Sequence, residues 1–419
     1  MHSRWVLLLC VLALIPLSGA SAMAASGSWS APLGIYNGME VVFPSANAGA
    51  TQIVFLNPNG TTPGYTDWYY DRQVFFMEDT GGAWSTPVVI GSNGMDRPTG
   101  WLPIVTHPVI SGDGSTIAYL GCTGVCKPVT QGDRYDIYVS RRGASGWSSA
   151  AAVATVAETL SSQIGISADG KTLVCVTFIP FGDLRYRVYV VQRTGEPWGS
   201  PTAISSDTVN AFLPVLSRDG KQVIWRSNQT GGGSDVLNYA SQLPGGGWSA
   251  PQALITNLIL GLSVADYSSF SSDGNSIFYW NVDTVGSDLT HVYLYVLRRV
   301  GSAWGFPQQV TPGVLPYTNE GFTAAVNSDG TRVVYPDPLL HADVFDDVSL
   351  QMVENKSETW GAPAAVSAHK EGAMYRFPMM SDDGKRLLAL GPSPEYDGPG
   401  LALFTYSVKY FTYLPFMKK

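Results

Sequence analysis

The feature that most limits how this chain can fold is a four-residue motif, Ser-x-Asp-Gly, that returns at intervals of 50 to 56 residues. An apolar, strand-like run follows each copy. The Asp side chain accepts hydrogen bonds from the backbone just ahead of it, and Gly adopts the positive φ of a tight turn. The motif therefore predicts a β-hairpin in every repeat. Its aspartates are Asp113, Asp169, Asp219, Asp273, Asp383 and, in a variant where Asn327 replaces Ser, Asp329, and a degenerate copy lies at Asn47.

A second motif, Trp-Ser/Gly-x-Pro, marks another strand of each repeat. Proline cannot donate to a β-ladder and belongs on an edge strand, whereas the tryptophan supplies apolar area that we expect to pack against the next unit. Between the two motifs lies a strand rich in Tyr and Val, for example 135–139. The sequence therefore predicts four strands in each repeat. The tryptophans are Trp29, Trp84, Trp198, Trp248, Trp304 and Trp360, and Trp147 has Ala150 in place of the proline.

Four strands per repeat with a recurrent aromatic residue predict the blade of a β-propeller. The outer-strand motif first occurs at Trp29, before any inner strand, and no such motif follows the last turn at Asp383. If strand 28–36 completes the blade built from 375–408, seven blades close into a ring without free sheet edges. Alternatively, residues 410–416 supply that last strand. We expect an all-β, seven-bladed propeller of four-stranded antiparallel blades over 27–408, and a tail at 409–419 with a sorting or docking role as one option.

The combination of these motifs, with its best middle strand at 131–140, resembles the TolB-type, WD40-like (PD40) propeller repeat family. It is most similar to secreted and envelope versions whose blades end in Trp-x-x-Pro. The resemblance runs from Trp29 to about Tyr406 and implies an envelope or extracellular location and binding of protein, peptide or glycan. The residue before Asp, often Pro in the family, is Gly, Ala, Arg, Ser, Ser or Asp here. We also expect no partner domain, so a peptidase or peptidoglycan-anchoring role is not carried over.

The N-terminal segment predicts export from the cytoplasm. Arg4, an apolar run at 5–17 and small residues at 20–24 indicate a signal peptide over 1–24, with an uncleaved anchor as the alternative. No second run of about 18 apolar residues follows, so the mature chain should have no membrane span. A net charge of −8 without a basic run argues against nucleic acid. We expect a secreted, extracellular or periplasmic monomer.

The cysteines suggest structural roles. Cys122 and Cys126 are close enough in sequence to form a disulfide across a loop, or they remain free thiols. Cys175 lies in an apolar run and is predicted to be a buried strand residue.

Known catalytic motifs do not fit the chain. Residues 165–172 match a phosphate-binding P-loop literally, but β-branched residues follow instead of a helix, and the segment coincides with a predicted hairpin. The Gly-x-Ser-x-Gly and His-Glu-x-x-His motifs are missing. No catalytic residue is predicted, and the sequence favours a binding or scaffold protein. The alternatives are a hydrolase or lyase that acts on glycan or peptide, and a purely structural surface protein.

Ligands of propellers usually sit where the loops that enter the inner strands converge, and this analogy of fold gives the candidate ligand-binding residues. Their alternative role is hydrogen bonding to neighbouring blades or water. The candidates at this channel mouth are Thr106, His107, Ser162, Gln163, Asp266, Tyr267, Glu320, Tyr375 and Arg376.

No cofactor is expected, with one weak exception. The predicted loop 336–347 carries Asp343, Asp346 and Asp347, and clustered carboxylates suit Ca²⁺. The alternative is a solvated loop without metal.

Overall fold

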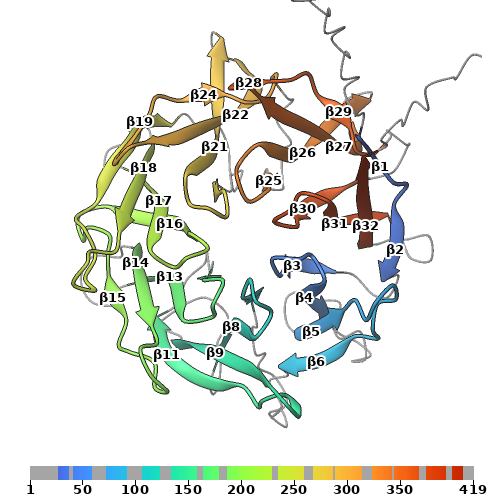
Figure 1. The fold of residues 1–419 in the computed structure, drawn as a ribbon. Coiled ribbons are helices and arrows are strands. Elements are labelled where there is room, and N and C mark those ends of the chain that lie inside the picture. Colours follow the sequence, from blue (N-terminus) through green and yellow to red (C-terminus); the bar gives the residue numbers. More distant parts are fainter. Residues whose placement is uncertain are drawn as a thin grey trace, which may run out of the picture.

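The computed structural model shows an all-β ring of seven antiparallel sheets, or blades (Figure 1). Within the described residues, no helix is long and apolar enough to cross a membrane. The description covers residues 27–36, 41–58, 72–91, 106–122, 134–157, 164–178, 186–228, 235–258, 268–285, 288–313, 323–341, 344–367, 374–392 and 399–408. The predicted fold class and blade number are confirmed.

Each blade runs from an inner strand at the ring centre to an outer strand at the rim, and we number the blades I to VII along the chain. Blade I is β3 (Val42–Ala46), β4 (Gln52–Pro58), β5 (Arg72–Glu78) and β6 (Val88–Gly91). Blade II is β7 (Thr106–Ile110), β8 (Thr116–Cys122), β9 (Arg134–Gly143), β10 (Gly146–Trp147) and β11 (Ala151–Ala157). Blade III is β12 (Ile164–Ile166), β13 (Thr172–Phe178), β14 (Tyr186–Gln192) and β15 (Thr202–Ala203). Blade IV is β16 (Asn210–Leu216), β17 (Gln222–Asn228), β18 (Asp235–Ser241) and β19 (Gln252–Leu258).

The remaining three blades follow the same order, with the outer strand broken into two short pieces. Blade V is β20 (Ser269–Phe270), β21 (Ser276–Val285), β22 (Asp288–Val300), β23 (Ala303–Trp304) and β24 (Gln308–Gln309). Blade VI is β25 (Ala325–Val326), β26 (Arg332–His341), β27 (Val344–Lys356), β28 (Thr359–Trp360) and β29 (Ala364–Ala365). Blade VII is β30 (Arg376–Met380), β31 (Arg386–Pro392) and β32 (Pro399–Val408), with β1 (Gly27–Trp29) and β2 (Leu33–Tyr36) as its outer strand.

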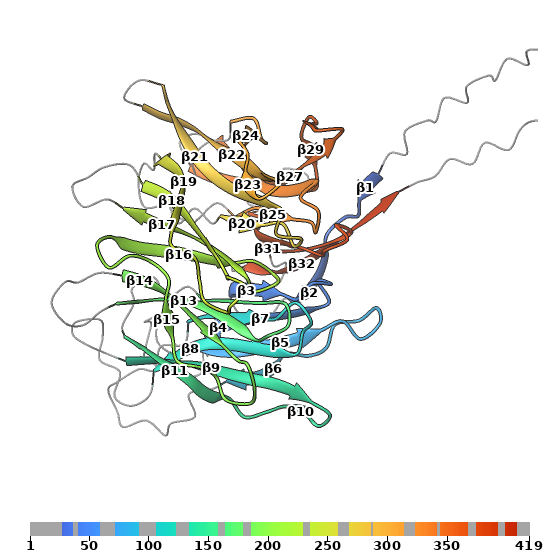
Figure 2. The same ribbon diagram turned by 60° about the vertical axis from the view of Figure 1, so that its left-hand side comes forward.

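The two ends of the propeller share blade VII, which closes the ring. Trp29 in β1 lies opposite Tyr406 in β32, and Leu33 in β2 lies opposite Leu403. Figure 2 shows β1 beside β32 at one edge of the ring. The predicted closure by the N-terminal strand is confirmed. The competing segment 410–416 lies outside the described residues, and β1 and β2 occupy the position it was to fill.

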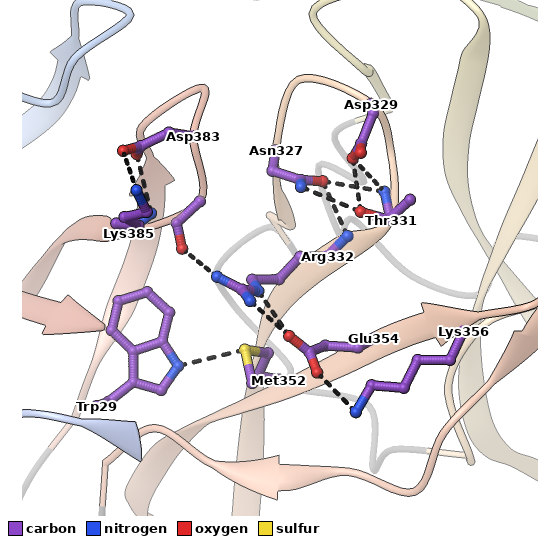
Figure 3. A network of polar contacts seen from close by, with 11 residues as sticks. Trp29, Asn327, Asp329, Thr331, Arg332, Met352, Glu354, Lys356, Asp383 and Lys385 are labelled. Atoms are coloured by element: carbon purple, nitrogen blue, oxygen red, sulfur yellow. Dashed lines mark hydrogen bonds and ion pairs between the residues drawn. The ribbon is translucent and has the colours of Figure 1, made fainter. Parts of the chain in front are cut away.

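Side chains reinforce this closure where blade VII meets blade VI (Figure 3). The indole Nε1 of Trp29 donates to Met352 Sδ at 3.3 Å, and its ring lies 5.2 Å from the ring of Tyr406. Arg332 of blade VI binds the Glu354 carboxylate at 2.6 and 2.9 Å, and its guanidinium stacks 4.0 Å from the centre of the Tyr406 ring. Stacked arginines of this kind contribute attraction beyond simple packing.

The Ser-x-Asp-Gly motif forms the tight inner hairpins predicted from sequence. In blade II, Ser111 Oγ donates to Asp113 Oδ1 at 2.6 Å, and Asp113 Oδ1 accepts the backbone N–H of Ser115 at 2.9 Å. Gly114 has a φ of 71°, which suits glycine because it has no Cβ to clash. The same hydrogen bonds recur in the hairpins of Asp169, Asp219, Asp273 and Asp383.

The repeated tryptophans pack against the preceding blade, so the expectation that they contact the next unit was wrong. Trp147 of blade II meets Phe76 of blade I edge-on at 5.1 Å, and Trp304 of blade V meets Tyr239 of blade IV at 5.6 Å. Trp198 of blade III packs against a core that contains Leu120 and Ile137 of blade II. The face of the outer strand that bears Trp is therefore directed toward the preceding blade. The spacing of the motifs along the chain does not specify this direction.

Blade I is fastened to both neighbours by charged pairs. Arg142 of blade II grips the Glu78 carboxylate at 2.6 and 2.8 Å, and Arg386 of blade VII binds Asp79 at 2.7 Å. The hydrogen bond from Arg142 lowers the pKa of Glu78. The pKa of Asp79 is lowered first by the Gly82 backbone N–H and then by Arg386.

These lowered pKa values predict acid lability at both junctions of blade I. A depressed carboxyl pKa gives stability that is complete above the ordinary values of 4.5 and 3.8 and is lost as pH falls through the folded-state values. We expect the double variant Glu78→Gln, Asp79→Asn to unfold at a lower temperature than wild type at pH 7. The difference in melting temperature between variant and wild type should shrink as pH falls below these ordinary values and disappear only below the folded-state pKa values. Thermal melts from pH 7 to pH 3 measure this difference.

The control for this prediction is Glu196→Gln. Glu196 pairs with Arg141 at 3.0 Å between blades II and III, but both side chains are exposed, and exposed pairs contribute little. Its melting temperature should follow wild type at every pH. A double variant whose deficit stayed constant down to pH 3 would contradict the assignment to carboxylate ionisation.

Candidate functional site

The two faces of the ring differ in what the strands deliver to them. Because strands in a blade are antiparallel, the inner hairpins and the turns before the outer strands lie on one face, the turn face. The connections from second to third strands, and from one blade to the next, leave from the opposite loop face. The inner strands begin at the loop face, so this is where the sequence places the channel mouth.

The structure describes only part of the predicted mouth. Thr106 and His107 open the inner strand β7, and Arg376 opens β30. Five candidates, namely Ser162, Gln163, Asp266, Tyr267 and Glu320, lie outside the described residues. Convergence of all nine residues at one mouth therefore stays a prediction.

Tyr375 lies in the core between blades VI and VII. It is 8% exposed, its backbone N–H donates to Val348 O at 2.9 Å, and its ring meets Phe404 edge-on at 5.6 Å. Burial raises the pKa of its phenol. These contacts match the alternative role of hydrogen bonding and packing between blades. The next residue, Arg376, is half-buried, and its Nη2 lies 2.9 Å from Met374 Sδ.

Four inner strands share a feature that the motif search missed, a proline that interrupts the β-ladder. A proline has no N–H for the ladder, and a bulge of one extra residue accommodates it. Each of these prolines lies three residues before the Ser or Asn of the hairpin motif, so spacing alone could have revealed them. These proline bulges are Phe43-Pro44, His107-Pro108, Leu213-Pro214 and Phe377-Pro378, in blades I, II, IV and VII.

The proline bulges hold strained backbone in the loop-face half of the inner strands. The residue before proline has a positive φ in three of them, 50° at Phe43, 54° at Leu213 and 49° at Phe377. Non-glycine residues rarely adopt this conformation, and strained positions cluster at functional sites. Phe43 packs toward the core between blades I and II, and Phe377 toward the core between VII and I. The bulges thus turn large apolar side chains into the seams between blades.

A buried ion pair supports the loop-face end of blade IV. Arg226 on β17 binds Asp235 on β18 at 3.1 Å, and Arg226 is only 3% exposed. Its guanidinium lies 5.9 Å from the centre of the Phe212 ring, beside the proline bulge of this blade. Burial raises the pKa of Asp235 more than the Arg226 charge lowers it. A buried pair of this kind is costly to desolvate, and here it fixes the strand ends from which connection 229–234 leaves.

The segment that carries the predicted metal ligands has a different local structure from the one expected. The segment predicted as loop 336–347 belongs mainly to the hairpin β26–β27, and Asp347 pairs with Leu339 in its register. The loop interpretation was therefore wrong, because strand pairing continues almost to the tip. Asp346 also lies in β27, whereas Asp343 is outside the described residues. The described part of the chain contains no group of three potential metal ligands.

Of the remaining sequence predictions, some are confirmed and the others concern residues outside the described part of the chain. Cys175 is a fully buried free thiol in β13, which confirms the predicted buried strand residue, and burial raises its pKa to about 12. Residues 165–172 run from the end of β12 through the hairpin turn to the start of β13, as predicted against a P-loop. Cys122 ends β8 and Cys126 is outside the described residues, so their disulfide stays a prediction. The same holds for the signal segment 1–24 and the tail 409–419.

The protein is thus a seven-bladed β-propeller, and comparison with known proteins supports the fold alone. No family model matches the sequence, and no curated protein matches it either. The structure is similar to an oligogalacturonate lyase from Vibrio parahaemolyticus, with 12% identity, a TM-score of 0.54, and coverage of 91% of this chain and 97% of that one.

Two other solved structures are similar over most of this chain. A prolyl endopeptidase has 11% identity and a TM-score of 0.51 over 89% of this chain, which spans only 50% of the endopeptidase. TolB from Acinetobacter baumannii has 16% identity and a TM-score of 0.42, over 78% of this chain and 66% of TolB. Both enzymes and TolB therefore occur among the similar structures.

Proposed function

We propose that this protein is a secreted or periplasmic binding or scaffold propeller that recognises a protein, peptide or glycan with its loop face. The observation that supports this most directly is the contrast between the faces. The turn face consists of tight hairpins tied by short hydrogen bonds. The loop face receives the long connections, such as those after Pro58 and Gly91. Variable loops on a rigid scaffold are the usual site of recognition.

The proline bulges add to this argument. They place strained inner-strand backbone at the loop-face half of the neighbouring blades VII and I, and also in blade IV. A closed ring holds such strain in place, because each bulged strand is paired along its length with a buried second strand. The loop face therefore has a stiff base on which ligand-binding loops can keep one arrangement.

Binding of the purified protein to arrays of defined glycans and synthetic peptides tests the proposal. We expect saturable binding that Arg376→Ala weakens by about tenfold, or ~1.4 kcal/mol. Arg141→Ala, on the exposed turn face, should leave the affinity unchanged. Equal melting temperatures of both variants would show that Arg376→Ala does not act by unfolding.

Three outcomes would contradict this function. Cleavage of a bound glycan or peptide, seen as new products by mass spectrometry, would establish the alternative hydrolase or lyase. Binding that depended on Arg141 and not on Arg376 would move recognition to the turn face. The absence of any saturable ligand across both arrays would reject recognition of these two ligand classes.

A further inference from the structure

The inner hairpins join one another around the ring centre on the turn face. The atoms involved belong to the second residue of each hairpin, or to the aspartate beside it. Six of the seven junctions between neighbouring hairpins carry a direct backbone hydrogen bond. These run from Ala48 N to Gly112 O (3.0 Å), Asp113 N to Ala168 O (2.8 Å), Ala168 N to Arg218 O (2.7 Å), Asp273 N to Ser328 O (2.9 Å), Ser328 N to Asp382 O (2.9 Å) and Asp382 N to Ala48 O (2.8 Å).

The exception is the junction of blades IV and V. Hairpins 217–220 and 271–274 both belong to the described chain, yet no backbone hydrogen bond joins them. Side chains make the connection instead, for example Gln222 Nε2, which donates to Gly274 O at 3.3 Å. Blades IV and V therefore meet at a seam that lacks the bond shared by the other six junctions.

Asp382 bridges this seam from the far side of the ring. Arg218 of blade IV donates to Asp382 Oδ1 at 2.7 Å, and Ser272 of blade V donates to the same oxygen at 2.7 Å. Asp382 belongs to blade VII, which is a neighbour of neither. In repeat folds each unit normally contacts only the adjacent units, so this contact across the centre is exceptional.

We propose that the Asp382 carboxylate is a releasable clamp that holds blades IV and V together across the centre of the ring. The Arg218 and Asp382 side chains keep 24% and 38% of their exposure. Dissolved salt screens exposed ion pairs, whereas it weakens a backbone hydrogen bond far less. The IV–V seam is accordingly the junction that opens first. Arg218 and Asp382 lie across the centre of the ring on the turn face. Release of the clamp therefore also opens the centre of the ring on that face.

Hydrogen exchange of the full chain, read in peptides 211–224 and 269–280, tests the clamp. Asp382→Asn keeps the side-chain shape and removes the charge, and Ser272→Ala removes the blade V donor alone. We expect either change to speed exchange in these two peptides by about tenfold, because ~1.4 kcal/mol of local stability corresponds to that factor. In wild type, raising NaCl to 1 M should speed the same peptides, and in Asp382→Asn it should not.

The matched control is Ser328→Ala, at the same motif position in blade VI. Ser328 joins its neighbours through backbone atoms, so loss of its hydroxyl should leave exchange unchanged in all hairpins. The clamp would be overturned if Ser272→Ala matched Ser328→Ala, or if exchange rose equally in all seven hairpins. Should Asp382→Asn fail to fold, Ser272→Ala and the salt series in wild type still decide the question.

Discussion

A chain that lacks residues 27–36 is expected to unfold at a lower temperature than the full chain and to associate with other copies of itself. These residues supply the outer strand of blade VII, and Trp29, Ile35 and Tyr36 pack against two of the buried cores. Half-burial of three such side chains contributes roughly 1 kcal/mol each, from a total stability of about 5–15 kcal/mol. Deletion also leaves β32 as an unpaired edge, which favours association between chains.

Size-exclusion chromatography and thermal melts measure this loss. We expect larger assemblies than the full chain forms and a midpoint lowered by about 5–10 °C. Ser28 and Ser407 are exposed and directly opposed in the β1–β32 register, so the pair Ser28→Cys, Ser407→Cys can form a disulfide that locks the closure. This oxidised variant should melt above wild type. A truncated chain that formed no larger assemblies than the full chain and kept its midpoint would contradict closure by the N-terminal strand.

The second large effect is expected at Gly170, where the motif glycine meets the preceding blade. A Cβ added there would lie 2.7 Å from Thr116 Cβ of blade II, and the backbone φ is +65°. The positive φ costs an alanine about 1–2 kcal/mol, and the overlap adds about 1–3 kcal/mol. Gly170→Ala should therefore lower the free energy of unfolding by roughly 2–5 kcal/mol.

Gly301 provides a control with matched backbone. Its φ is +63°, yet an added Cβ would meet nothing within 4 Å. Gly301→Ala should lose only the backbone contribution of about 1–2 kcal/mol. Urea unfolding of both variants isolates the packing contribution as the difference between them. Equal losses at the two positions would indicate that contact between hairpins adds nothing to the conformational need for glycine.

Local chemistry explains why so much of the fold was predictable. In Ser111–Gly114 the aspartate, the serine and the positive φ of glycine define a hairpin within four residues, and no distant contact is needed. Repetition of that hairpin gave the strand order, and the unmatched motif at Trp29 gave the closure. The candidate site was harder. Tyr375 was predicted at the mouth from its distance to the turn, and that distance does not tell that its side chain is buried between two blades.

The amino-acid sequence by itself thus determined the hairpins, the four-stranded repeat, the number of blades and the strand that closes them, because each depends on short-range hydrogen bonds and on a count of motifs. Only the tertiary structure decided which sheet each tryptophan packs against, and that Arg218, Ser272 and Asp382 meet. The physical reason is that these contacts join residues far apart in sequence and form only once the blades have packed into the ring. Closure brings together the second residues of hairpins that are far apart in sequence and that no interaction between sequence neighbours connects.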